Sequence, residues 1–341
     1  MNGKAYGLAL AALFLAAPIT PSTISAQVAS PPLSEHLAPA EQIARGNLST
    51  RIDQLGRSFD GHVGIAVRDV ETGWTTSWNG EAFFPQQSVS KFWVAITAFQ
   101  AVDAGQLDLD QRVTVRREDL TLFHQPIAAK VLGGGATMSL SQLMYEAITK
   151  SDNTANDKLM RSVGGPAAVR AMIAEKGLGA IRFYDGERAL QSKIAGLIWT
   201  QSYSVGGAFY KARNALPLSV RQAAFNRYID DPYDGASPRA IVDALARLKR
   251  GELLSPSSTQ KLLSIMSNTK TGPQRLKGGL APGWTLAHKT GTGQVLGGTQ
   301  AGYNDIGVLT APDGSAYAAG MSVFGNVIAL PWLSTSFAVG R

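Results

Sequence analysis

The chain has 341 residues, of which 45% are hydrophobic, with 32 Lys and Arg against 25 Asp and Glu. These values exclude a disordered or collagen-like chain and allow a large buried core. The absence of cysteine excludes disulfides, thiol nucleophiles and cysteine-ligated metals. The four histidines are far apart in the sequence, so a zinc site of the HxH or HExxH kind has no ligand pair. We expect no metal and no cofactor. The basic residues are spread along the chain, and their densest cluster, 247–250, is too short to indicate a nucleic-acid partner.

The N-terminal residues have the pattern of an export signal. Lys4 is followed by a short apolar run and then by small residues up to Ala26. This arrangement is typical of a secretory signal peptide, and the apolar run is too short to span a bilayer. We therefore predict a signal peptide over 1–26, a loose Pro/Ser-rich leader over 27–40 and a catalytic domain over 41–341. The expected location is periplasmic or secreted, without a stable membrane anchor.

Hydrophobic spacing predicts strands at both ends of this domain and helices between them. The expected helices cover 41–59, 88–104, 139–149, 152–163, 166–177, 238–250 and 255–266. The expected strands cover 62–70, 75–78, 284–293, 305–310 and 316–324. The predicted fold class is α+β: an antiparallel sheet built from both terminal segments and flanked by helices, with an all-helical lobe inserted over about 88–280. A cleft between sheet and lobe is the natural place for a site.

Ser88 and Lys91 form an S-x-x-K sequence at the start of a predicted helix. Residues three apart on a helix share a face, so the amine can lie beside the hydroxyl. An amine with a lowered pKa can take the hydroxyl proton, and a helix N-terminus favours the negative charge that develops. Alone, this short motif is common by chance.

Two further motifs also have ordinary structural interpretations. Ser151-Asp152-Asn153 lies between two predicted helices, where its simplest role is a helix N-cap. Lys289-Thr290-Gly291 lies on a predicted strand. The free backbone N–H groups of a strand edge can hold an oxyanion, but a surface strand end with a glycine bulge would look the same.

In combination and in this order, S-x-x-K, S-D-N and K-T-G are the signature set of class A β-lactamases and penicillin-binding proteins. From about residue 41 to 326 the chain resembles this superfamily, and the class A serine β-lactamases most closely. A fourth element, Glu187 within 182–191, resembles the family's R-x-x-x-x-E-x-x-L-N loop. Gln191 stands where the family usually has Asn. A longer amide can still hydrogen-bond a water, but with different geometry.

The resemblance implies hydrolysis of the amide bond of a small-molecule β-lactam through a serine acyl-enzyme. Ser88 would be the nucleophile, Lys91 and Glu187 would share its proton, and Glu187 would activate the deacylating water. Ser151 and Lys289 would pass a proton to the leaving nitrogen.

Substrate-binding roles are also implied by the resemblance. Asn153 would bind the substrate's side-chain amide, and the N–H groups of Ser88 and Thr292 would form the oxyanion hole. The implied ligands of the substrate carboxylate are Lys289, Thr290, Thr292 and Arg275. Gly291 would also line the substrate site, with Gln191 beside the deacylating water. We expect a monomer.

Two alternatives and one departure remain open. The chain could be a peptidoglycan DD-peptidase or esterase-like relative, or a β-lactam-binding protein that does not hydrolyse. Residues 193–228 exceed the family pattern, are rich in aromatics and predict two helices broken at Leu216-Pro217. This insertion is either a helical elaboration packed on the domain or a lid or partner surface beside the site.

Overall fold

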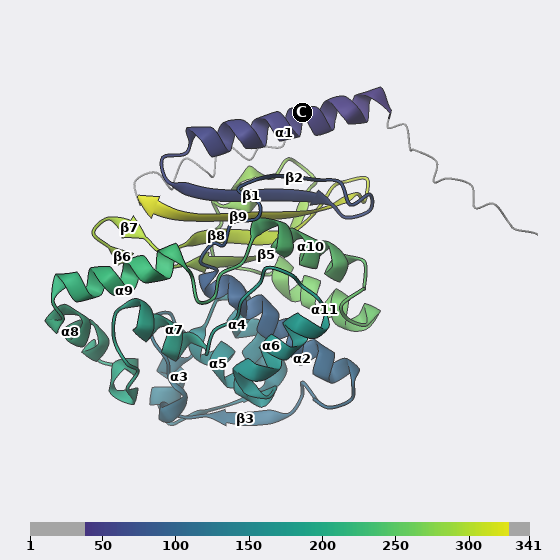
Figure 1. Cartoon of the computed structure of the whole chain (residues 1–341). Helices are drawn as coiled ribbons and strands as arrows, with labels where there is room; N and C mark the ends of the chain where they lie inside the picture. Colours follow the sequence, from purple (N-terminus) through teal and green to yellow (C-terminus); the bar gives the residue numbers. More distant parts are fainter. Residues whose placement is uncertain (1–37, 327–341) are drawn as a thin grey trace, which may run out of the picture. The chain divides into compact units, whose positions relative to one another are not determined.

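The computed structural model describes residues 38–326, drawn as a coloured ribbon in Figure 1. The predicted signal peptide over 1–26, most of the leader and the C-terminal segment after 326 lie outside the described residues. The chain divides into two units after Gln42, and the sheet and all three motifs belong to the second. No helix within the described part is both long and apolar enough to cross a membrane.

An antiparallel sheet joins the two ends of the described chain, as the sequence predicts. Its main strands are β1 (His62–Asp69), β2 (Thr75–Trp78), β5 (Thr285–Thr292), β8 (Tyr303–Thr310) and β9 (Ala316–Asn326), in the order β2-β1-β9-β8-β5. Two short strands, β6 (Val295–Leu296) and β7 (Thr299–Gln300), continue from the end of β9. Ile65 of β1 lies opposite Met321 of β9, so residues distant in sequence form the centre of the sheet.

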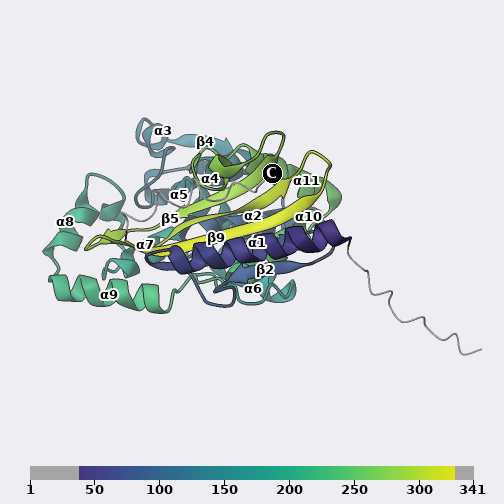
Figure 2. The ribbon, with the colours of Figure 1, turned by 90° about the horizontal axis from the view of Figure 1, so that it is seen from above.

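Helices cover both faces of this sheet. Helix α1 (Pro39–Ser58) packs Ile52 and Leu55 against the outer face, where it runs along the strands in Figure 2. Helix α10 (Pro238–Lys249) covers the inner face. Side chains of β1 point to both faces of the sheet: Val63 and Ile65 pack against α1, whereas Ala66 packs into the main core.

The inserted region is mostly helical. Besides α10, its helices are α2 (Lys91–Asp103), α3 (Ala128–Leu132), α4 (Leu140–Thr149), α5 (Asn153–Ser162), α6 (Gly165–Glu175), α7 (Glu187–Ile194), α8 (Ala208–Ala215), α9 (Leu218–Asp230) and α11 (Pro256–Ser267). Helix α2 is buried at every position from Lys91 to Phe99, as expected for a helix that is apolar all round. It forms the axis around which α4, α5 and α6 pack.

The prediction of an all-helical lobe needs one correction. Strands β3 (Arg112–Val115) and β4 (Ala136–Ser139) form a separate two-stranded sheet inside the lobe. Each strand has four residues, and β3 alternates polar with apolar residues over only that length. A pattern this short does not distinguish a strand from a loop.

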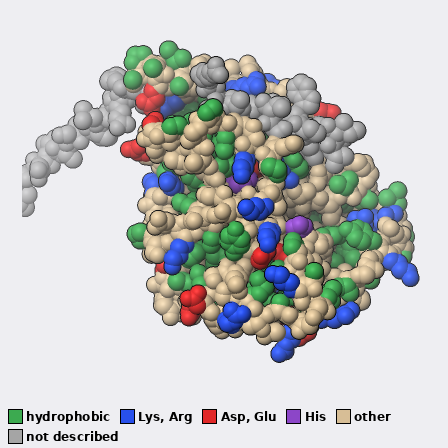
Figure 3. All heavy atoms as spheres, turned by 180° about the vertical axis from the view of Figure 1, so that it is seen from behind, with side chains coloured by type: hydrophobic (Ala, Val, Ile, Leu, Met, Phe, Trp, Pro, Cys, Tyr) green, Lys and Arg blue, Asp and Glu red, His purple; other side chains and the backbone are tan. Residues whose placement is uncertain are grey.

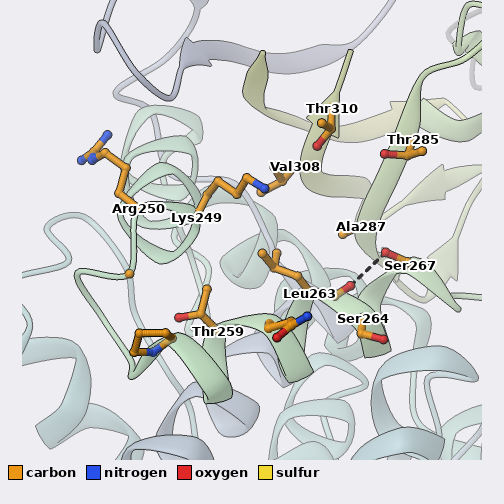
Figure 4. A pocket seen from close by; sticks show the side chains of 13 residues that line it. Lys249, Arg250, Thr259, Leu263, Ser264, Ser267, Thr285, Ala287, Val308 and Thr310 are labelled. Atoms are coloured by element: carbon orange, nitrogen blue, oxygen red, sulfur yellow. Dashed lines mark hydrogen bonds between the residues drawn. The ribbon is translucent and has the colours of Figure 1, made fainter. Parts of the chain in front are cut away.

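Two surface features complete the described part. On the face in Figure 3, Lys and Arg side chains are scattered among other types and form no single continuous patch. A pocket of about 530 Å³ lies between α11, the end of α10 and strands β5 and β8. Figure 4 shows Lys249 extending toward Val308 in this pocket, which none of the motif residues lines.

Candidate active site

Ser88 lies on a tight turn directly before the central helix. The turn is a 3₁₀ segment, η1 (Gln87–Ser90), that runs into α2 at Lys91. Gln87 has a φ of 54°, a left-handed conformation that is uncommon for a residue with a side chain. Its backbone N–H is held 2.7 Å from Oδ2 of the buried Asp234. The residue before the serine is therefore fixed by a long-range contact.

Lys91 is the centre of the candidate site. Its ammonium lies 2.6 Å from the Ser88 Oγ, 2.6 Å from the Asn153 Oδ1 and 2.7 Å from the Glu187 Oε1. A lysine has three N–H donors, and these three partners use them all. The side chain is fully buried, so the Glu187 carboxylate compensates a charge that would be costly alone.

The S-D-N motif acts both as a helix cap and as part of this cluster. Asp152 caps α5 by accepting the Ala155 N–H at 2.8 Å. Ser151 has a φ of 61°, and its Oγ accepts a hydrogen bond from Lys289 at 3.0 Å. Asn153 donates to the Leu122 carbonyl at 2.8 Å while its Oδ1 holds Lys91. Since the cap falls on Asp152, its two neighbours are free to face the site.

Strand β5 lies directly against the serine turn. A Cβ on Gly291 would stand 2.3 Å from the Gln86 carbonyl oxygen, so only glycine allows this approach. Lys289 is fully buried and donates to the Thr290 carbonyl at 2.7 Å as well as to Ser151. Burial lowers the pKa of Lys289 well below its ordinary value, and the nearby cations Lys91 and Arg275 lower it further.

Glu187 is the first residue of α7 and is buried. Its backbone N–H donates to the Asp157 Oδ1 at 3.1 Å. Burial, together with the charge of Glu187, raises the pKa of Asp157 to about 6. One turn along, the Gln191 Nε2 lies 3.3 Å from the Glu187 Oε2 and 3.0 Å from the Gln87 Oε1. The substituted amide of this sequence therefore contacts the carboxylate directly.

Arg275 lies at the end of the K-T-G strand. It donates to the Gly291 and Asn304 carbonyls at 2.9 and 2.6 Å and to the Thr292 Oγ1 at 2.6 Å. Its guanidinium also stacks 3.7 Å from the centre of the Tyr303 ring. The cation is thus rigidly placed beside Thr292. The neighbouring Thr290 shares a hydrogen bond of 2.5 Å with Thr271.

Comparison with known proteins agrees with this arrangement. The model of the "Beta-lactamase enzyme family" matches residues 47–327. The chain belongs to the class A β-lactamase family. It is 28% identical to Beta-lactamase VEB-1 of Pseudomonas aeruginosa over 268 residues, 79% of each chain. It is 30% identical to Extended-spectrum beta-lactamase PER-1 of the same species over 234 residues, 68% of this chain and 64% of the relative.

Solved structures show the same fold. A β-lactamase from Chitinophaga pinensis DSM 2588 has a TM-score of 0.69 at 29% identity, covering 86% of this chain and 96% of that one. TLA-3 extended-spectrum beta-lactamase has a TM-score of 0.70 at 25% identity, with the same coverage.

In this class A fold, all the residues singled out from the sequence come together. Ser88, Lys91, Asn153 and Glu187 form one hydrogen-bonded cluster, and Ser151 with Lys289 forms a second. Gln191 adjoins the first cluster. The strand residues Thr290, Gly291 and Thr292 adjoin the second, together with Arg275. His124 is exposed, and its Nε2 lies 2.7 Å from the Lys150 carbonyl oxygen.

Four residues of the class A site were missed by the sequence reasoning. Gln87, Asp234, Gln294 and Asn304 hold the serine turn, the Gln191 amide or both. None belongs to a short motif, and a left-handed Gln87 has no sequence signature. Tyr228 belongs to the aromatic-rich insertion, and its hydroxyl donates to Asp234 at 2.8 Å.

Proposed function

We propose that this chain hydrolyses the amide bond of β-lactams through an acyl-enzyme on Ser88, with Glu187 activating the water that releases the product. One observation carries the proposal: a single buried ammonium, Lys91, touches both the Ser88 hydroxyl and the Glu187 carboxylate. The two oxygens are no farther apart than the sum of those two contacts. That separation is within the span of two hydrogen bonds through one water, about 5.5 Å.

In the acylation step, the Ser88 oxygen attacks the lactam carbonyl as its proton passes to the group formed by Lys91, Glu187 and a bridging water. The backbone N–H groups of Ser88 and Thr292 hold the oxyanion. The ring C–N bond then breaks, and its nitrogen receives a proton from Ser151, replaced from Lys289. The lowered pKa of Lys289 makes it a readier proton donor for this relay.

In the deacylation step, Glu187 removes a proton from water, and the resulting hydroxide attacks the ester carbonyl. The Ser88–acyl bond breaks, and the serine oxygen receives the proton that Glu187 took from the water. This step separates a hydrolase from a slow acylating relative. It requires Glu187 as a base near the acylated serine, and the Lys91 ammonium that touches Ser88 also lies 2.7 Å from the Glu187 Oε1.

The substrate carboxylate would bind at the other end of the site. Thr290, Thr292, Lys289 and Arg275 supply hydroxyls and positive charge there, while Gly291 lets the strand approach the serine turn. Asn153 would hold the substrate's side-chain amide. An anionic small molecule suits this arrangement, and the four residues need no cofactor to bind it.

Turnover of a chromogenic cephalosporin by the purified chain tests the proposal, with Ser88→Ala as the matched control. We expect multiple turnovers that the variant abolishes, and intact-mass measurements should show an adduct only when Ser88 is present. An adduct that persists without turnover would indicate a β-lactam-binding relative. Faster hydrolysis of a D-alanyl-D-alanine peptide than of the cephalosporin would indicate a DD-peptidase. The absence of any adduct would contradict both β-lactam hydrolysis and β-lactam binding through Ser88.

We also propose that the chain acts as an exported monomer. The N-terminal pattern ending near Ala26 supports export. Periplasmic or extracellular recovery of a chain that begins near Gln27, measured by fractionation and N-terminal mass, is the expected result. Cytoplasmic recovery of a chain that retains residues 1–26 would contradict it.

A further inference from the structure

The insertion over 193–228 packs against the elements that carry the site. Helix α9 buries Phe225 and Tyr228 against Leu190 and Ile194 of α7. Helix α8 buries Phe209 against Leu122, whose carbonyl holds Asn153. The two helices are separated at Leu216-Pro217, as the sequence predicts, and lie beside α7, β6 and β7 in Figure 1. The elaboration is thus packed on the domain, and it also reaches the catalytic cluster.

One polar group of the insertion enters that cluster. The Tyr228 side chain is fully buried, and its hydroxyl donates to the Asp234 Oδ1 at 2.8 Å. The same hydroxyl oxygen accepts a hydrogen bond from the Gln87 Nε2 at 2.6 Å. Burial and the adjacent Asp234 raise the pKa of Tyr228 well above its ordinary value, so the phenol keeps its proton.

The hydrogen bonds from Tyr228 have a fixed direction. A phenol has one proton, and since Tyr228 gives it to Asp234, its oxygen can only accept from the Gln87 amide nitrogen. The Gln87 Oε1 is then turned toward the Gln191 Nε2, 3.0 Å away. The Gln191 Oε1 is held from the other side by the Gln294 Nε2 at 3.1 Å. Each amide orientation thus follows from the one before it.

We infer that Tyr228 is a positioning residue for deacylation: through Gln87 it fixes the Gln191 amide with its N–H group toward Glu187. The hydrogen bond from this amide to the Glu187 Oε2 orients the carboxylate that removes the proton from water. The inference rests on the proposed function, because Glu187 is the base of that proposal. The insertion would then affect catalysis through a fixed contact. A lid, in contrast, would have to open and close.

Tyr228→Phe removes the hydroxyl and keeps the ring, so it separates positioning from packing. We expect the deacylation rate of a cephalosporin acyl-enzyme to fall about tenfold, as for loss of about 1.4 kcal/mol, while the acylation rate changes less than about twofold. Rapid mixing with intact-mass detection measures the two rates separately. The matched control is Phe225→Leu, one turn earlier in the same cluster, which loses packing but no hydrogen bond. Its ratio of deacylation to acylation should equal that of the wild type.

Two further variants test the route of the effect. Gln294→Ala, at a partly exposed position outside the described apolar clusters, releases the Gln191 amide without risk to the core and should also slow deacylation. In a Gln191→Ala background, Tyr228→Phe should change deacylation less than about twofold, because the amide through which it acts is gone.

The outcomes separate this inference from the proposed function. Suppose the wild type hydrolyses the cephalosporin and Tyr228→Phe has the same ratio of deacylation to acylation rates. This result would overturn the role of Tyr228 but leave the proposed function intact. If Tyr228→Phe slowed deacylation by the same factor in the Gln191→Ala background as in the wild type, Tyr228 would not act through Gln191, and its proposed role would also be overturned. A wild type that forms no adduct would overturn the proposed function and this inference with it.

Discussion

The two sides of the site are held in place by different means. The strand side, with Lys289 to Thr292, belongs to β5, which pairs with β8 at every residue from Thr285 to Thr292. The helix side, with Glu187 and Gln191, lies on an eight-residue helix held by side-chain hydrogen bonds and by the insertion. Backbone pairing tolerates side-chain changes, whereas a side-chain network does not. Substrate binding and deacylation should therefore respond differently to mutation.

Lys91 holds Ser88, Asn153 and Glu187 together, and its loss should have the largest effect. Lys91→Met removes the partner of the buried Glu187 carboxylate and the contact to Ser88. We expect acylation to slow at least a thousand-fold, on the order expected for losing a positioned proton-transfer group, and stability to fall by about 3–5 kcal/mol. Single-turnover kinetics and urea unfolding measure these effects. Acylation near the wild-type rate would remove Lys91 from the mechanism.

Asp234 holds Tyr228 and the residue before Ser88, and its burial predicts a pH-dependent stability. Burial raises its pKa from 3.8 to about 7, so between these values the folded chain holds a proton that the unfolded chain releases. Its contribution to stability is therefore complete below pH 3.8 and is lost as the pH rises through 7. Asp234→Asn cannot titrate. The stability of wild type relative to this variant should fall by roughly 4 kcal/mol over that range.

Urea unfolding at a series of pH values measures this difference. The matched strand-side substitution is Thr271→Val, which adds no titratable group and should track the wild type. If the free energy of unfolding changed with pH in parallel for wild type and Asp234→Asn, Asp234 would have the same pKa in the folded and unfolded chain. That result would contradict the effect of burial.

Arg275 allows a kinetic test of the strand side of the site. Arg275→Ala removes the charge beside Thr292 and the donors to the Gly291 and Asn304 carbonyls. We expect KM to rise about 10- to 100-fold, as for a charge-assisted contact, while the deacylation rate stays within about threefold. Steady-state kinetics combined with acyl-enzyme decay distinguishes the two. A selective loss of deacylation would show that the sides are not separate.

The smallest expected effect concerns the hydroxyl pair on the strand side. Thr271→Val removes the hydrogen bond to the Thr290 Oγ1. A loss of about 1 kcal/mol in stability and less than a fivefold rise in KM are expected, because β5 keeps its backbone pairing. Thermal unfolding and initial rates give both values. A larger kinetic change than that of Arg275→Ala would reverse the order of importance on this side.

The same division explains what could be predicted from the sequence. The strands around Ile65 and Lys289 were predicted from hydrophobic spacing. The S-x-x-K and S-D-N motifs, with Glu187, marked the residues that meet at Lys91. The short β3–β4 pair gave too little pattern to predict. The left-handed Gln87 and the hydroxyl of Tyr228 depend on partners more than a hundred residues away, which local spacing does not encode. The direction of the Gln191 amide is likewise a consequence of the folded network.

The most direct test of the account is the decay of the acyl-enzyme in Glu187→Gln, followed by intact mass after mixing with a cephalosporin. We expect wild type to clear its adduct quickly, whereas the variant should retain a Ser88 adduct for at least about a hundred times longer, as for loss of a general base. Clearance by the variant at the wild-type rate would show that Glu187 does not activate the water, and would contradict the proposed hydrolysis.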